Sequence, residues 1–207
     1  DNVDVAAVRA RGIALHNSSH ILARDVANTA ILLLLAVTRD LVNADAFVRD
    51  GRWSDGGSYP LGRSIVGMNV GILGLGAIGT EIARRLEALG AKVFYSGPKK
   101  KPVEWPYFPT PLALAQGCDV LILTCPLTDE TRHLVDATVL DALGPRGYLI
   151  NIARGPVVDE AALIAALAHR RIAGAGLDVF EFEPQVPQEL LESPRLVLTP
   201  HIGSGTE

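Results

Sequence analysis

Hydrophobic and polar residues follow one another along the chain in blocks that predict strands alternating with helices. From residue 70 onward, short apolar runs of strand length are separated by segments whose apolar residues recur at helical spacing. We predict strands at 70–73, 93–95, 120–124, 148–152, 173–179 and 196–199. We predict helices at 78–89, 111–116, 137–143, 159–169 and 189–191. Strands that alternate with helices pair in parallel, so the expected fold is α/β with a doubly wound parallel sheet.

The first sixty residues have a different and mostly helical pattern. A short helix at 1–11, ended by Gly12, is expected to precede a strand at 13–15 and a turn at 17–19. From about 22 to 49 the apolar spacing predicts one long helix or two abutting ones. A loop with three glycines follows at 51–59, and we expect its Trp53 to pack under the loop rather than to stand exposed.

Composition and charge exclude several classes of function. The net charge is −4 without a basic stripe, which argues against a nucleic-acid or membrane-surface partner. The longest apolar run, 30–37, is too short to span a membrane. Cys118 and Cys125 lie at opposite ends of a predicted strand, too far apart for a disulfide, so we expect free thiols and a cytoplasmic protein without a signal peptide. We expect no metal site.

One glycine-rich turn joins the strand at 70–73 to the following helix with the spacing G-x-G-x-x-G. Gly74 permits a tight turn, Gly76 leaves room for a pyrophosphate, and Gly79 lets the helix pack closely on the sheet. The amino end of the helix offers unpaired N–H groups and a partial positive charge to phosphates. The pattern therefore predicts a dinucleotide-binding turn made of Gly74, Leu75, Gly76, Ala77, Ile78 and Gly79.

Charged side chains follow three successive strands of the predicted sheet. Arg154 follows the strand at 148–152, Asp178 and Glu183 follow the next one, and His201 follows the last. Ligands of a doubly wound sheet bind outside the carboxyl ends of its strands, so these side chains are expected beside the cofactor. Taken singly, each fits an ordinary surface charge or a structural histidine. Their occurrence together at one edge favours a catalytic site.

Four ordered motifs make the chain resemble the D-isomer-specific 2-hydroxyacid dehydrogenases, a Rossmann-fold family. The motifs are Gly-Leu-Gly-Ala-Ile-Gly at 74–79, Asn-Ile-Ala-Arg-Gly at 151–155, Gly-Leu-Asp-Val-Phe-Glu-Phe-Glu-Pro at 176–184 and Thr-Pro-His-Ile-Gly-Ser at 199–204. In that family the dinucleotide-binding domain is inserted into a substrate domain. The resemblance implies that this chain is the cofactor lobe of a two-lobe dehydrogenase.

The same resemblance implies a division of the chain into three parts. Residues 1–17 would be the end of the first substrate-domain segment, and residues 18–200 the dinucleotide-binding domain. Residues 201–207 would be the catalytic loop and the start of the return to a substrate domain that is mostly absent from this chain.

Roles for the polar residues also follow from the resemblance. His201 would protonate the carbonyl oxygen of a 2-oxo acid, and Glu183 would hydrogen-bond His201 and favour its imidazolium form. Arg154 would hold the substrate carboxylate with its planar fork of donors. Thr124, Cys125 and Pro126 would lie along the adenosine, and Asp178 would contact the nicotinamide carboxamide. The other implied cofactor contacts are Ile152, Ala153, Arg154, His201, Gly203 and Ser204.

The end of the second strand departs from the commoner NAD-binding pattern. NAD-binding members place an acid there for the ribose 2′-OH, whereas here Ser96 leads to a run of three lysines, Lys99, Lys100 and Lys101. A hydroxyl and lysines suit a 2′-phosphate, so we expect NADP(H) to be preferred, with NAD(H) possible; the alternative is a solvated basic loop. This stretch and residues 183–187 resemble the glyoxylate/hydroxypyruvate reductase branch, including its hydroxyphenylpyruvate reductases.

The leading hypothesis is NADPH-dependent reduction of glyoxylate, hydroxypyruvate or an aryl-pyruvate to a D-2-hydroxy acid, with the isolated chain mainly binding cofactor. The resemblance also implies a homodimer, formed by the helix near 26–47 and the loop with Trp53. An alternative is an NAD(H)-sensing, corepressor-like binding protein of the same family. A third hypothesis, a phosphoglycerate or D-lactate dehydrogenase, is disfavoured by the missing acid after the second strand.

Overall fold

A seven-stranded sheet, parallel throughout, forms the centre of the computed structural model, which describes residues 3–15 and 21–207. The strand order is β3-β2-β1-β4-β5-β6-β7, so the direction of winding reverses between β1 and β4. The strands are β1 (Asn69–Leu73), β2 (Lys92–Ser96), β3 (Tyr107–Phe108), β4 (Val120–Leu123), β5 (Tyr148–Asn151), β6 (Gly174–Leu177) and β7 (Leu196–Leu198). The predicted doubly wound α/β sheet is confirmed.

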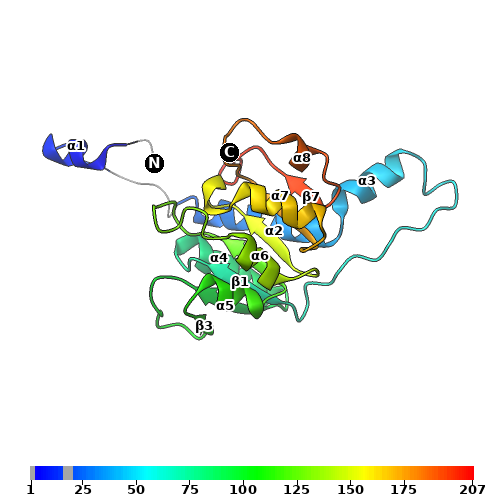
Figure 1. The fold of residues 1–207 in the computed structure, drawn as a ribbon, viewed down its shortest axis with the longest axis horizontal. Helices are drawn as coiled ribbons and strands as arrows, with labels where there is room; N and C mark the ends of the chain where they lie inside the picture. Colours follow the sequence, from blue (N-terminus) through cyan, green and yellow to red (C-terminus); the bar gives the residue numbers. More distant parts are fainter. Residues whose placement is uncertain (1–2, 16–20) are drawn as a thin grey trace.

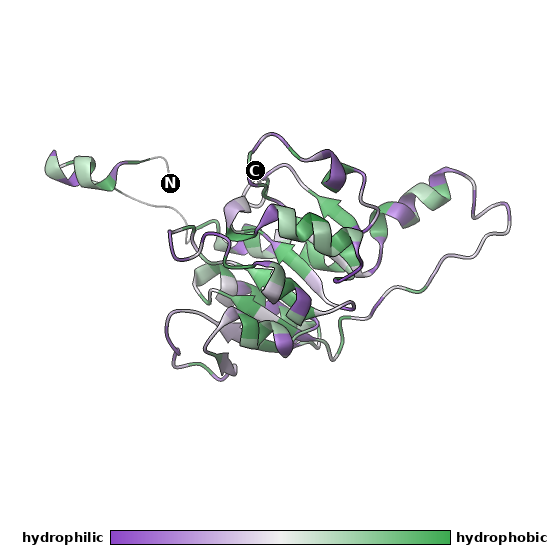
Figure 2. Cartoon of the chain, in the orientation of Figure 1, coloured by the Kyte–Doolittle hydropathy of each residue, from purple (hydrophilic) through white to green (hydrophobic). Residues whose placement is uncertain are grey.

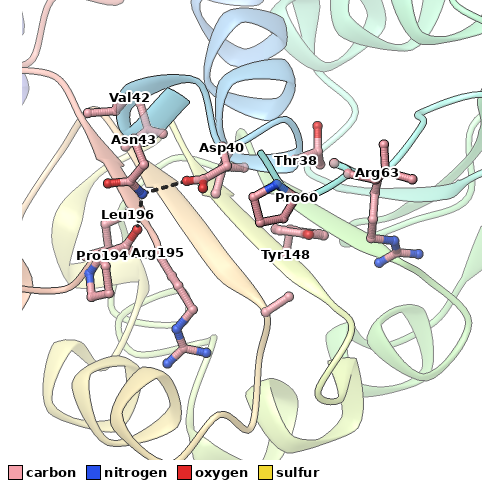
Figure 3. Close-up of a pocket in the computed structure, with 15 residues that line it drawn as sticks. Thr38, Asp40, Val42, Asn43, Pro60, Arg63, Tyr148, Pro194, Arg195 and Leu196 are labelled. Carbon is pink, nitrogen blue, oxygen red and sulfur yellow. Dashed lines mark hydrogen bonds between the residues drawn. The ribbon is translucent and has the colours of Figure 1, made fainter. Parts of the chain in front are cut away.

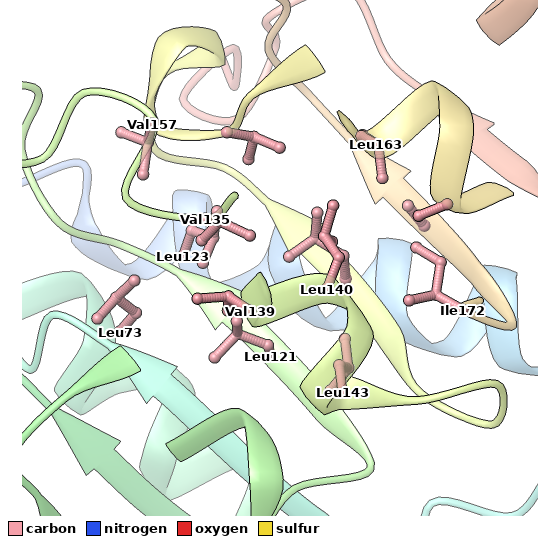
Figure 4. Close-up of a cluster of buried hydrophobic side chains, with 14 of the residues drawn as sticks. Leu73, Leu121, Leu123, Val135, Val139, Leu140, Leu143, Val157, Leu163 and Ile172 are labelled. Carbon is pink, nitrogen blue, oxygen red and sulfur yellow. The ribbon is translucent and has the colours of Figure 1, made fainter. Parts of the chain in front are cut away.

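Helices cover both faces of this sheet and bury its apolar strands (Figure 2). One face carries α2 (Ala23–Thr38) and α4 (Ala77–Ala88), and the other carries α5 (Pro111–Gln116), α6 (Ala137–Leu143) and α7 (Glu160–Ala168). Side chains alternate along each strand, so Val70 and Ile72 pack toward α2 and α4, whereas Leu121 and Leu123 join the cluster around α6 (Figure 4). Strands buried on both faces are typical of parallel sheets.

The first residues differ from the prediction. A helix does form, α1 (Val5–Ala10), and the carboxylate of Asp4 caps it by accepting a hydrogen bond from Ala7 N at 2.9 Å. Residues 13–15 were predicted as a strand, but they pair with no strand in the described ranges, and a strand needs a neighbouring backbone. Figure 1 shows α1 apart from the body of the domain. The predicted turn at 17–19 lies outside the described residues.

Of the two alternatives predicted over 22–49, the structure has two abutting helices, α2 and α3 (Leu41–Arg49), because the backbone at Asp40 is left-handed, with φ +53°. Figure 1 shows α3 and the loop that follows it projecting from the body of the domain. Trp53 in this loop is 66% exposed, so the expectation that it packs under its own loop is wrong. The loop extends away from the core, and Trp53 only borders a shallow hollow beside Phe47.

The remaining elements are short. They are the 3₁₀ turn η1 (Gly155–Val157) and the helix α8 (Gln188–Leu191). No helix within residues 3–15 and 21–207 is both long enough and apolar enough to cross a membrane.

Substitutions of two leucines on α5 test which of its side chains belong to the hydrophobic core. Leu114 is fully buried against β1 and β4, whereas Leu112 on the same helix is exposed. We expect Leu114→Ala to lower the free energy of unfolding by about 2–5 kcal/mol, because it removes buried methyl groups and leaves a cavity. The control Leu112→Ala should change it by about 0.5 kcal/mol. Urea unfolding followed by circular dichroism measures both, and equal losses would contradict the assignment.

Candidate cofactor and catalytic site

The glycine-rich turn lies where β1, α4 and the end of β4 approach one another. Gly74 has φ +102°, and a Cβ atom there would lie 2.7 Å from Cys125 N, so only glycine fits. A Cβ atom on Gly79 would lie 2.5 Å from Gly74 O, which shows how closely α4 packs against the turn. Gly76 is the N-cap of α4 and faces open space. These distances support the roles that the spacing predicts for the three glycines.

A cavity of about 300 Å³ opens at this turn, at the carboxyl ends of β1, β2 and β4. Its position is the point where the strand order reverses, which is where doubly wound sheets bind their ligands. It is lined by Gly74, Leu75, Gly76, Tyr95, Gly97, Pro98, Lys99, Lys101, Thr124, Cys125 and Pro126. The structure therefore brings together predicted cofactor residues from the turn, from the loop after β2 and from the end of β4.

The loop after β2 differs in detail from the expectation. The side chain of Ser96 does not line the cavity, because this residue is only 1% exposed, and its carbonyl oxygen accepts a hydrogen bond from Gly74 N at 2.9 Å. Lys100 is exposed but also lies outside the cavity lining. Lys99 and Lys101, the other two lysines of the predicted run, do line it. The Lys101 ammonium donates to the carbonyl of Leu75, and its backbone N–H donates to the Tyr95 hydroxyl at 2.7 Å.

A second hollow, of about 440 Å³, adjoins the first at the amino end of α4. Its charged lining residues are Arg24, Glu81, Arg84 and Lys101, so cations outnumber the one acid. The hydrogen bond from Arg85 lowers the pKa of the Glu81 carboxyl, and the positive charges of Arg84 and Arg24 lower it further. Predicted residue Ala77 lines this hollow, whereas Ile78 and Gly79 lie deeper in α4 and line neither space. The basic lining suits an anionic ligand.

Both cysteines are free thiols, as expected. Burial raises the pKa of Cys125 to about 11, and burial next to Asp119 raises that of Cys118 to about 12. Both side chains are therefore uncharged at neutral pH. Cys125 contributes a small neutral surface to the cavity at the glycine-rich turn.

The pair predicted to be catalytic is formed in the structure. His201 Nδ1 lies 2.7 Å from Glu183 Oε2, and Glu183 Oε1 accepts a hydrogen bond from Phe180 N at 2.9 Å. Both oxygens of the carboxylate are thus engaged, which fixes its direction toward the imidazole. The two side chains border a cavity of about 240 Å³, which Phe180, Pro184, Val186 and Pro200 complete.

Asp178 builds the turn that carries His201. It is 2% exposed; Oδ1 accepts hydrogen bonds from Thr199 Oγ1 at 2.6 Å and Ile202 N at 2.9 Å, and Oδ2 accepts one from Gly203 N at 2.8 Å. Its own carbonyl oxygen accepts from His201 N at 2.9 Å. The structure therefore gives Asp178 a positioning role, and its contact with a nicotinamide stays a prediction.

Arg154 lies in the turn that follows β5, where the chain leaves the sheet. Asn151 shapes this exit, because its Oδ1 accepts a hydrogen bond from Ala153 N at 3.0 Å and its Nδ2 donates to Arg154 O at 3.1 Å. Arg154 is exposed, and Nη1 donates to Ala153 O at 2.6 Å. A Cβ atom on the next residue, Gly155, would lie 1.8 Å from Phe180 O, so the Arg154 turn packs directly on the loop that carries Glu183.

The other predicted contacts lie at the same edge. Ile152 and Ala153 are buried, Gly203 is buried against Asp178, and Ser204 is exposed. In the described part of the chain, no group of three or more His, Cys, Asp or Glu side chains could hold a metal ion.

A parallel sheet with a glycine-rich turn at its switch point, and a His–Glu pair at the same edge, define the cofactor domain of a dinucleotide-dependent oxidoreductase. The chain belongs to the D-isomer specific 2-hydroxyacid dehydrogenase family, whose NAD binding domain matches residues 31–203. The resemblance found in the sequence motifs is thereby confirmed.

Relatives in this family are similar over the whole chain. A glyoxylate/hydroxypyruvate reductase of Arabidopsis thaliana is 49% identical over 207 residues, and a hydroxyphenylpyruvate reductase of Plectranthus scutellarioides is 45% identical; this chain spans 66% of the length of each. The crystal structure of an NADPH-dependent glyoxylate/hydroxypyruvate reductase from Sinorhizobium meliloti, in complex with NADP and malonate, matches with a TM-score of 0.94 and 48% identity. The match covers 100% of this chain and 65% of that one.

Proposed function

We propose that the protein reduces small 2-oxo acids (glyoxylate, hydroxypyruvate or an aryl-pyruvate) to D-2-hydroxy acids with NADPH, and that this chain is its cofactor lobe. The observation that carries the proposal is the 2.7 Å contact between His201 and Glu183 at the edge that holds the dinucleotide turn. The relatives named as glyoxylate, hydroxypyruvate and hydroxyphenylpyruvate reductases support the substrate class. The proposed division into residues 1–17, 18–200 and 201–207 agrees with a core that begins at Ala23.

The residues at the turn fit a dinucleotide phosphate. Gly76 presents open backbone at the amino end of α4, and Arg24, Arg84 and Lys101 surround it with positive charge. Thr124, Cys125 and Pro126 line the adjoining cavity at the glycine-rich turn. When bound there, the nicotinamide cofactor supplies the hydride for the reduction.

The side chains at the edge of the sheet supply the proton and hold the substrate. Because Glu183 engages Nδ1 of His201, Nε2 is left to donate a proton to the carbonyl oxygen of the 2-oxo acid. The Glu183 carboxylate also fixes the orientation of the imidazole ring. The guanidinium of Arg154 holds the substrate carboxylate through a planar fork of N–H donors.

The alternative, an NAD(H)-sensing binding protein of the same family, would use the same turn and cavity. A sensing protein would have no use for the His201 imidazole that Glu183 orients. This pair therefore favours the reductase. Glyoxylate turnover by the full-length protein separates the two. We also propose a cytoplasmic location, which the free thiols Cys118 and Cys125 support.

Removing the proposed acid tests the reaction. In the full-length protein we expect His201→Ala to lower kcat for glyoxylate reduction by roughly 10²–10⁴, because a positioned general acid contributes about that factor. NADPH affinity should change little. His169→Ala, at an exposed histidine that ends α7, is the control and should retain parental kcat. A parental kcat in His201→Ala would remove this residue from the proposed reaction.

Cofactor choice is tested with the 207-residue chain. We expect NADPH to bind roughly ten- to a hundred-fold more tightly than NADH at low salt, because a charge-assisted hydrogen bond contributes about 1.5–3 kcal/mol. Lys101→Ala should bring the two affinities close together, whereas Lys92→Ala, at the opposite end of β2, should leave the preference unchanged. Fluorescence titration measures the affinities of all three proteins for both cofactors, and the preference should shrink with added salt. Equal affinity in the unmutated chain would contradict the proposed preference.

We also propose that two chains pair through α2, α3 and residues 50–62. The projecting arm, which consists of α3 and residues 50–62, exposes apolar side chains. Among them are Leu41, Val48, Trp53 and Leu61. At its base lies a cavity of about 340 Å³ between Asp40, Pro60 and Arg63 on one side and the starts of β5 and β7 on the other (Figure 3). Exposed apolar surface of this kind marks interaction sites.

Sedimentation velocity at micromolar concentration tests the dimer. We expect the chain to sediment as a dimer and the double variant Trp53→Ser/Leu61→Ser to shift toward monomer, because it removes two exposed apolar anchors. Val103→Ser, at an exposed position outside the arm, is the matched control. A monomer at this concentration in the unmutated chain would refute the pairing.

A further inference from the structure

A second histidine–carboxylate pair lies next to the one proposed to be catalytic. His133 Nε2 is 3.1 Å from Glu181 Oε1, and Glu181 stands two residues before Glu183. The backbone N–H of Glu181 donates to Glu160 Oε2 at 3.2 Å. The three residues come from the loop before α6, the loop after β6 and the first turn of α7. None of them has a part in the reduction proposed above.

His133 has an unfavourable backbone conformation. Its φ is +51°, a left-handed value that few residues other than glycine adopt, with asparagine, aspartate and histidine the commonest of them. The backbone N–H of His133 donates to Pro156 O at 2.8 Å, which holds the residue against η1. Strained residues persist where the surrounding structure uses them. Here the strained residue is the one whose side chain reaches Glu181.

The Phe180–Glu181 peptide is confined on several sides. Glu160 accepts its N–H, and the backbone of Gly155 lies so close that a Cβ atom there would be 1.8 Å from Phe180 O. The Glu181 side chain is held by His133. On the preceding residue, the Phe180 N–H donates to Glu183 Oε1 at 2.9 Å, and the other oxygen of Glu183 contacts His201. The direction of the Glu183 carboxylate thus depends on where this peptide is held.

The third residue, Glu160, is a buried acid close to the carboxylate of Glu181. Glu160 is 7% exposed, and this burial raises the pKa of its carboxyl, with a further rise from the nearby Glu181 carboxylate and an opposing effect of the Glu181 N–H. His133 contacts one of these two acids, Glu181.

We propose that His133 and Glu181 are positioning residues, which hold the Phe180–Glu181 peptide so that the Phe180 N–H keeps Glu183 directed at His201. The inference rests on the proposed function, in which Glu183 and His201 carry the proton transfer. It adds a requirement to that site: an outer pair, 48 residues apart in sequence, sets the geometry of the inner pair.

Amide hydrogen exchange in the 207-residue chain tests the proposal. In His133→Asn, the shorter side chain tolerates the left-handed backbone but does not reach Glu181. We expect the Phe180 amide to exchange at least about ten-fold faster than in the parent, and the Nδ1–H signal of His201 in ¹H–¹⁵N spectra to weaken. The amides of β5 should keep their parental rates. His169→Asn, at the exposed end of α7, is the matched control and should change none of these signals.

A second variant, Glu181→Ala, removes the other partner and retains the backbone N–H that donates to Glu160. We expect the same acceleration, and no further increase in His133→Asn/Glu181→Ala, because both changes remove one contact. A parental Phe180 rate in either single variant overturns the proposal, as does an acceleration that β5 shares equally. The readout needs neither cofactor nor substrate. Parental turnover in His201→Ala would refute the proposed function without altering this result.

Discussion

At the end of β1, the backbones of the glycine-rich turn, of α4 and of the segment after β4 lie very close together. The rest of the site depends on this constraint. Gly74 has no room for a side chain beside Cys125, and Gly79 has none beside the carbonyl of Gly74. Because the sheet reverses its winding between β1 and β4, this crowded point is also the mouth of the crevice. Close packing there brings the amino end of α4 to the cavity, where Gly76 faces open space.

Hydrogen bonds from main-chain N–H groups to two carboxylates organise the opposite part of the edge. The Asp178 carboxylate accepts hydrogen bonds from the N–H groups of Ile202 and Gly203 and so shapes the turn that carries His201. Glu183 takes its direction from the N–H of Phe180. A buried carboxylate that accepts several N–H bonds is well stabilised without a cationic partner. The proposed acid and its partner are therefore held by the loops' own backbone.

Periodicity predicted the sheet and most helices from β1 onward, because a strand buried on both faces needs a continuous apolar run such as residues 120–123. It failed at residues 13–15, where an apolar run has no partner strand, and it could not detect β3, which has two residues. The predicted His201–Glu183 contact formed. Of the residues predicted after β2, Lys99 and Lys101 line the cavity whereas Ser96 is buried, because the path of this loop leaves no periodic signal. The same holds for His133 and Glu181, which meet only through tertiary folding.

The position of Lys101 has a consequence for the entropy of ligand binding. A lysine side chain that is ordered only on binding loses rotamer freedom equivalent to about 1.5–2 kcal/mol. In this fold the Lys101 ammonium already donates a hydrogen bond to the carbonyl of Leu75, and the backbone N–H of Lys101 donates to the Tyr95 hydroxyl. Much of that ordering has therefore taken place during folding. An arriving anion exchanges one oxygen partner of the ammonium for another, so the domain is preorganised for the charge that it receives.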